Sequence, residues 1–191
     1  MKKLIFQLLL LSCFSPLYAQ NGERAFETIS IYVGGTHHVN HTRFNDYWNP
    51  GTGLELTVKT PFYLGYAEAG GALQPFDGFA MDVPDFYSLG VFVGWGFRFR
   101  QLSPLEILAG VRAGNNRMSF DYDAYYGERN ESELTLAVRS EVALRLFRGW
   151  SVFAAGTYAK TYTYIRLKPF YVTAGVSHTF NTPQWLRTIL R

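Results

Sequence analysis

Three histidines close together are the first residues that could do chemistry. His37, His38 and His41 lie within five positions, with Asp46 nearby. Such a group could ligate a transition metal or supply a general base. Two adjacent histidines on an extended segment point to opposite sides, however, and no second pair of ligands stands out elsewhere. We therefore expect a solvated loop here, with no catalytic, cofactor-binding or metal site.

A second candidate is the acidic and aromatic stretch from Asp121 to Glu128. It could bind calcium or the surface of a partner. Calcium favours several oxygen ligands, and the stretch lacks the spacing and closing glutamate of an EF-hand loop. We expect an exposed loop.

The elements that position these residues follow a period of two. From Tyr87 to Phe99 the odd positions are aromatic or aliphatic, while the even ones are mostly glycine, serine or arginine. Residues 133–146 repeat the pattern with opposite parity. Alternation of this kind indicates a β-strand. Weaker versions at 27–36, 52–60, 62–73, 105–114, 151–162 and 168–180 bring the total to about eight strands.

The connections between these strands alternate in length. Long ones are expected around 37–51, 74–86 and 118–132, and tight ones at Thr60-Pro61, Leu102-Ser103-Pro104 and Arg148-Gly149. Long loops on one rim and short turns on the other are typical of an antiparallel up-and-down transmembrane β-barrel. The predicted fold class is therefore all-β.

The polar face of the strands decides between a soluble barrel and a membrane barrel. Much of that face is glycine and alanine with a few charges, as a narrow lumen requires. Six basic and five acidic positions fall on it, so their signs nearly cancel, and opposite charges offset one another in a confined space. We expect these side chains to plug the lumen, with Arg139 or Arg112 paired to Glu106, Glu141 or Glu68. An ordinary mixed-charge solvent face is the alternative. The predicted network contains Glu55, Lys59, Glu68, Arg98, Arg100, Glu106, Arg112, Glu133, Arg139, Glu141 and Arg145.

The first residues have the order of a secretory signal peptide. Lys2 and Lys3 precede a short apolar run, and small Ala19 precedes a polar stretch, so cleavage after Ala19 is expected. Lipidation at Cys13, the single cysteine, is the alternative. Loss of the two lysines lowers the net charge from +3 to +1. This near-neutral charge gives no support for nucleic-acid binding.

The last strand alternates from Phe170 through Val172, Ala174, Val176 and His178 to a terminal aromatic, Phe180. In this, the chain resembles the small outer-membrane β-barrel superfamily of OmpA/OmpX-like type. The resemblance implies residence in the bacterial outer membrane, contact with its lipid and lipopolysaccharide, and recognition of the last strand by the barrel-assembly machinery. The domains expected are a signal peptide over 1–19, a barrel over 20–180 and a periplasmic tail over 181–191. Thr182 and Pro183 favour a short helix in that tail.

The expected function is a structural or interaction role in the cell envelope, with the long extracellular loops as the binding surface and without enzymatic activity. A narrow pore for small solutes is the first alternative. The resemblance suggests a second, because some small barrels modify lipid A with a histidine, a serine and an acidic residue near the outer rim. Here a histidine from 37–41 would have to meet Ser88 and either Asp82 or Asp85.

Overall fold

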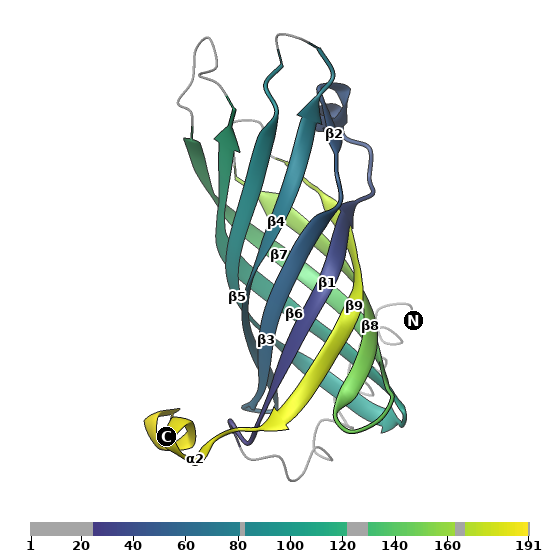
Figure 1. Cartoon of the computed structure of the whole chain (residues 1–191), viewed down its shortest axis with the longest axis vertical. Coiled ribbons are helices and arrows are strands. Elements are labelled where there is room, and N and C mark those ends of the chain that lie inside the picture. The colour runs from purple at the N-terminus through teal and green to yellow at the C-terminus, as the bar shows by residue number, and fades with distance from the viewer. Residues whose placement is uncertain (1–24, 81–82, 122–129, 163–166, 191) are drawn as a thin grey trace, which may run out of the picture.

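A single antiparallel sheet closes on itself to form the barrel shown in Figure 1. The computed structural model describes residues 25–80, 83–121, 130–162 and 167–190. Eight strands pair with their sequence neighbours, and β1 pairs with β9 to close the ring. The strands are β1 (Thr28–His38), β2 (Trp48–Pro50), β3 (Gly53–Phe62), β4 (Gly65–Gly78), β5 (Phe86–Leu102), β6 (Leu105–Phe120), β7 (Asn130–Arg145), β8 (Trp150–Thr161) and β9 (Phe170–Asn181).

The expected all-β barrel of about eight strands is confirmed, with three differences in detail. The short strand β2 adds to the edge of β4 at the loop end of the barrel, where no alternation marks it. Strands β4 and β6 run further towards that end than predicted. The turn expected at Thr60-Pro61 lies at Tyr63 and Leu64 instead, both with positive φ. Pro61 itself belongs to β3, where its carbonyl accepts a hydrogen bond from the Phe26 N–H.

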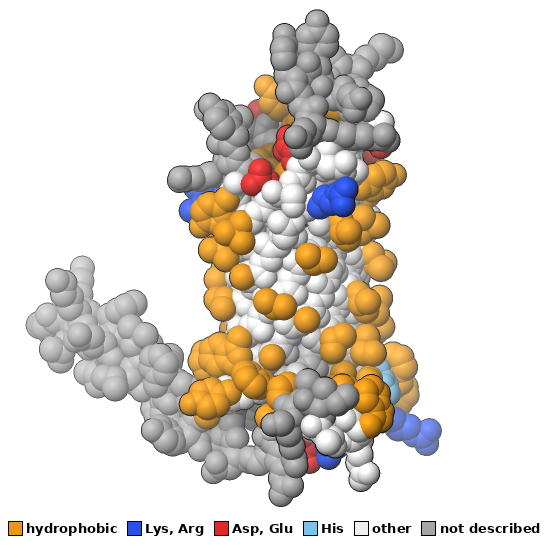
Figure 2. Space-filling model, turned by 90° about the vertical axis from the view of Figure 1, so that its left-hand side faces the viewer, with side chains coloured by type: hydrophobic (Ala, Val, Ile, Leu, Met, Phe, Trp, Pro, Cys, Tyr) orange, Lys and Arg blue, Asp and Glu red, His pale blue; other side chains and the backbone are white. Residues whose placement is uncertain are grey.

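Apolar side chains cover the outer wall of the barrel. Val91, Val93, Leu136, Val138 and Val142 are all exposed, and Trp95 lies half-buried on the same side. On the face drawn in Figure 2, hydrophobic groups are spread over the wall and charged groups lie towards the two ends. In water such a surface would drive aggregation, whereas hydrocarbon solvates it well. The wall is therefore built for lipid.

The lumen, in contrast, is lined by polar and small residues. Strand β4 had an ambiguous facing in the sequence, and the structure turns Tyr66 and Glu68 inward and buries both. Gly70 lies so close to β3 that an added Cβ would stand 2.4 Å from the Leu56 carbonyl oxygen. The small residues of β4 thus allow close approach of the neighbouring strand.

The two ends of the barrel differ. At the end where the long loops gather, Phe76, Phe86 and Met118 form a buried cluster, and the partly buried Phe44 packs against it. The short 3-10 helix η2 (Arg43–Asp46) carries Phe44 into this position. The start of β1 and the helix α2 lie at the other end, with the short turns (Figure 1).

The tail beyond the last strand forms the helix α2 (Gln184–Leu190), as expected. Thr182 N and Arg187 Nη2 both donate to the Glu27 carbonyl oxygen, at 3.0 and 3.1 Å. Trp185 is 65% exposed. No helix in the described part of the chain is long and apolar enough to cross a membrane.

Depth on the outer wall gives a direct test of the membrane assignment. Val138 and Leu134 lie on the same face of β7 and are 53% and 54% exposed, but Leu134 is closer to the loop end. We expect Val138→Arg to reduce the free energy of unfolding by about 2–4 kcal/mol, and Leu134→Arg by no more than about 1 kcal/mol, because the cost of a charge falls towards the interface. Urea titration of the lipid-refolded protein measures both. Equal small losses would indicate a soluble wall.

The tail is expected to be dispensable for folding. A chain that ends at Thr182 keeps all nine strands and the Thr182–Glu27 hydrogen bond. Its unboiled form should therefore still migrate differently from its boiled form on a detergent gel, as the full chain should. Loss of this difference would show that α2 holds the barrel together.

Candidate functional site

Six buried charged side chains lie near the middle of the lumen and form a closed ring of alternating sign. We call this set the charge ring. Its members come from β3, β4, β6 and β7. Side chains alternate between the two faces of a strand, so on each of these strands the members of the ring point into the lumen and the residues next to them face lipid. The ring runs, in order, through Lys59, Glu141, Arg139, Glu55, Arg112 and Glu68.

One half of the charge ring centres on Glu141. Lys59 Nζ donates to Glu141 Oε2 at 2.6 Å. Arg139 Nε donates to the same oxygen at 3.1 Å, and Arg139 Nη2 lies 3.0 Å from it at an angle that makes an ion pair rather than a hydrogen bond. The Lys59 ammonium also stands 4.1 Å from the centre of the Tyr32 ring, which stabilises a desolvated cation further.

The other half is built around Arg112. Its Nε donates to Glu68 Oε1 at 2.8 Å and its Nη2 to Glu68 Oε2 at 3.0 Å, a two-pronged contact. Arg112 Nη2 also reaches Glu55 Oε1 at 3.3 Å, and Arg139 Nη1 approaches that oxygen to 3.0 Å. Lys59 and Glu68, 4.0 Å apart, close the ring. Three positive and three negative groups thus compensate one another by direct contact.

A smaller charged group lies nearer the short-turn end. Arg98 Nε approaches Glu106 Oε1 to 2.8 Å, and Arg145 Nη2 donates to Glu106 Oε2 at 3.2 Å. Arg98 and Glu106 are buried, whereas the Arg145 side chain is 46% exposed at the mouth. An apolar cluster that includes Tyr32 and Phe153 is buried along the strands between this group and the charge ring.

The structure therefore brings together nine of the eleven residues predicted for the lumen. Arg139 and Arg112 contact Glu141 and Glu68, whereas Glu106 pairs with other arginines. Glu133 is half-buried near the loop end of β7, away from these groups. Arg100 lies on β5, but its side chain is outside the described part. Sequence parity did not indicate that Glu55 would bridge two arginines.

The histidine segment differs from the expected solvated loop. His37 and His38 belong to β1, which continues two residues beyond the predicted strand, so His38 turns inward and is buried. His38 Nε2 is 2.8 Å from Asn40 Oδ1. His41 is exposed and lies 3.4 Å from Asp46. The described residues hold no group of three or more histidine, cysteine or acidic residues suited to a metal ion.

The described residues of the suggested lipid A-modifying site have other partners. The Ser88 hydroxyl donates to Asn116 Oδ1 at 2.7 Å, and the Asp85 carboxylate accepts from the Gly78 N–H at 2.7 Å. Asp82 lies outside the described residues. Two other predicted segments also lie outside them: most of the stretch from Asp121 to Glu128, and the whole signal peptide. Neither Ser88 nor Asp85 is hydrogen-bonded to a histidine in the described structure.

Comparisons with known proteins identify the fold. No family model matches the chain, and no curated protein does. Among solved structures, neisserial surface protein A is 14% identical, with a TM-score of 0.61 over 80% of this chain and 97% of that one. The attachment invasion locus protein Ail of Yersinia pestis is 17% identical, with a TM-score of 0.53 over 81% and 99%. The outer membrane protein OprG from Pseudomonas aeruginosa is 13% identical, with a TM-score of 0.54 over 82% and 97%. The chain has the fold of these outer-membrane β-barrels.

The charge ring makes a prediction about stability. Lys59→Met leaves a net negative charge in a fully buried cluster, and we expect it to lower the free energy of unfolding by about 3–5 kcal/mol. The double variant Lys59→Met with Glu141→Gln restores neutrality and should lose less than the single variant. Arg145→Met serves as a control at a half-exposed site, where the loss should stay near about 1 kcal/mol. Urea titration in lipid vesicles provides the measurement. A double variant less stable than Lys59→Met would contradict the neutrality argument.

Proposed function

We propose that the protein is a closed barrel of the bacterial outer membrane with a structural or interaction role in the cell envelope. Its long loops, at the end opposite the short turns, form the binding surface. The charge ring carries this proposal, because its members fill the lumen and bond to one another, so a hydrated path along the axis has to break several ion pairs. Removal of residues 1–19 during export, and insertion by the barrel-assembly machinery, belong to the same proposal.

The loop end offers a surface for a partner. Asp77, Asp85, Asp121 and Glu131 are exposed there. The backbone N–H of Asp121 donates to the Asp85 carbonyl oxygen, which holds the ends of two of these segments together. Trp48 Nε1 donates to the Pro84 carbonyl oxygen at 2.8 Å and ties a third segment to them. We call these four exposed carboxylates the acidic platform. Their negative charge suits a partner with a basic surface.

The ligands expected for the acidic platform differ from the ligand found with one structural neighbour. Ail of Yersinia pestis has been crystallised with sucrose octasulfate, a heparin analogue. A polyanion would be repelled by the exposed carboxylates of the platform. We therefore expect this chain to select cationic partners, and a polyanion to bind weakly.

Contact with the membrane surface is proposed for both ends of the wall. Arg117 and Lys160 face outward on β6 and β8 towards the loop end, where they suit the phosphates of lipopolysaccharide. At the other end, the exposed Trp185 suits the interface between lipid and periplasm. These contacts would hold the barrel at a fixed depth.

Planar-bilayer recording tests the closed lumen. We expect the purified wild-type protein to give no stable conductance steps. The double variant Arg139→Ala with Glu55→Ala removes one charge of each sign and a large volume, so it should conduct small ions. Arg117→Ala removes an outward arginine and should remain silent. Large, stable steps from the wild-type protein would overturn the proposal and favour the pore for small solutes.

A further inference from the structure

The lumen between the charge ring and the aromatic cluster at the mouth contains a cavity. It has about 110 Å³ of room for the centres of water molecules. One water needs roughly 10–15 Å³ of such room and occupies about 30 Å³ in the liquid, so the space suits a molecule about as large as a monosaccharide. A smaller cavity of about 30 Å³ shares Ser88, Asn116, Thr161 and Tyr171 with it and reaches Lys168 and Pro169 near the outer end. We call the two together the upper chamber.

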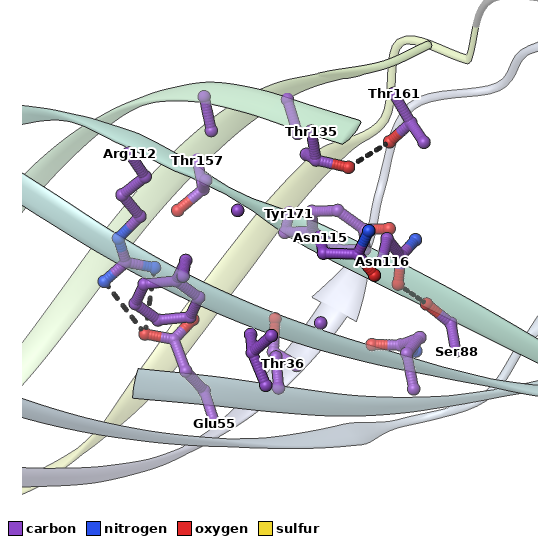
Figure 3. A pocket seen from close by; sticks show the side chains of 18 residues that line it. Thr36, Glu55, Ser88, Arg112, Asn115, Asn116, Thr135, Thr157, Thr161 and Tyr171 are labelled. Atoms are coloured by element: carbon purple, nitrogen blue, oxygen red, sulfur yellow. Dashed lines mark hydrogen bonds and ion pairs between the residues drawn. The ribbon is translucent and has the colours of Figure 1, made fainter. Parts of the chain in front are cut away.

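Above Glu55 and Arg112, and apart from Lys168 at the outer end, the side chains that line the upper chamber are neutral, and several hydroxyl groups lie among apolar carbon atoms that form most of the exposed surface. Figure 3 shows Thr36, Ser88, Asn116, Thr135 and Thr161 around the larger cavity. Some of these groups pair with each other: Ser88 donates to Asn116 at 2.7 Å, and the Thr135 and Thr161 hydroxyls are 3.0 Å apart. Each hydroxyl oxygen has two lone pairs, so every pair keeps acceptor capacity for a further donor.

Two buried polar atoms beside the upper chamber lack a partner in the described structure. They are Gln74 Oε1 and His38 Nδ1. The orientation of Asn40 is fixed, because its Oδ1 accepts from the Phe170 N–H while its Nδ2 donates to the Lys168 carbonyl oxygen. Asn40 Oδ1 can therefore only accept from His38, which makes His38 Nε2 the donor and Nδ1 an acceptor. Both unpartnered atoms are thus acceptors, and because neighbouring groups cover them, a side-chain shift has to expose them to a ligand.

The floor of the chamber selects against charged ligands. Glu55 and Arg112 line it, but each already forms ion pairs with two members of the charge ring. An entering carboxylate or ammonium group would find no free counter-charge and would have to lose its water at a cost of several kcal/mol. Aromatic faces are also present, since Phe92 and Tyr171 belong to the lining and can pack against the C–H side of a ring.

We propose that the upper chamber is a binding site for a small, neutral, hydroxyl-rich molecule, of the polyol or monosaccharide class, that enters from the outer end. The charge ring closes the other direction, so the ligand is captured and released on one side of the membrane. The site is separate from the acidic platform and does not depend on a macromolecular partner.

The variant Gly90→Leu tests the site by filling part of the cavity. A Cβ added to Gly90 would meet nothing closer than 3.9 Å, so Gly90→Leu places its side chain in the cavity without a backbone clash. Gly35 on the outer wall is the matched control, because its added Cβ also has its nearest neighbour at 3.9 Å and the position is exposed. Detergent-gel migration before and after boiling checks the folding of both variants.

The experiment titrates D-glucose, glycerol and glucuronate into the full mature chain in lipid nanodiscs and follows the side-chain amide signals of Asn116 and Gln74 by NMR. We expect saturable shifts with glucose or glycerol, loss of at least about tenfold in affinity for Gly90→Leu, and unchanged affinity for Gly35→Leu. Glucuronate should bind at least about tenfold more weakly than glucose, because its carboxylate stays unpaired.

If Gly90→Leu does not fold, the double variant Thr135→Val with Thr161→Val removes two hydroxyls at nearly constant volume. It should weaken binding of glucose by at least about threefold. Absence of saturable shifts with both glucose and glycerol would overturn the proposal and leave a chamber that holds only water. Equal affinity in the folded Gly90→Leu variant, or tighter binding of glucuronate, would also overturn it.

Discussion

Charge neutrality inside a closed lumen is the constraint on which the rest of the structure depends. A barrel of eight strands has an interior just wide enough for side chains, so a charged group that points into its middle is removed from water. Lys59 and Glu141 are fully buried, and either one alone would cost several kcal/mol. The charge ring resolves this by giving each member two partners of opposite sign. The register of β3, β4, β6 and β7 has to keep these six groups within reach of one another.

The same closure determines the outer surface. Because β1 pairs with β9, no strand edge is left open along the wall, and the backbone polar groups find partners within the sheet. Successive residues of a strand then face the lumen and the lipid in turn. The distribution of polar and apolar side chains is therefore the reverse of that in a water-soluble protein, because charged groups are buried while Val93 and Val138 are exposed. This inversion explains why the fold resembles outer-membrane barrels although sequence identity is 14% or less for two of the three neighbours described.

The lumen is divided along its axis into parts with different capacities. Towards the short turns, Tyr32 and Phe153 pack against each other between two ion-paired groups, and a second cavity opens beyond them at Arg98, Glu106 and Arg145. Towards the loops, small residues such as Ala137 and Gly90 leave room, and neutral polar groups surround it. In the function that we propose, the charge ring closes the barrel, the upper chamber holds a small ligand, and the acidic platform binds a different partner.

The sequence by itself determined the strands and their faces, because a period of two is a local property that needs no knowledge of neighbours. It therefore sufficed to predict an all-β barrel with Arg139 and Glu141 inside and Val138 outside. It did not indicate β2, whose three residues are too few to show alternation, or the burial of His38, which depends on how far β1 stays paired with β9. Which charges meet was decided only by the tertiary structure. Parity places Glu55 inside, but its contact with Arg112 and Arg139 depends on the register and tilt of strands that are far apart in the sequence, and a shift of one residue would reverse every facing.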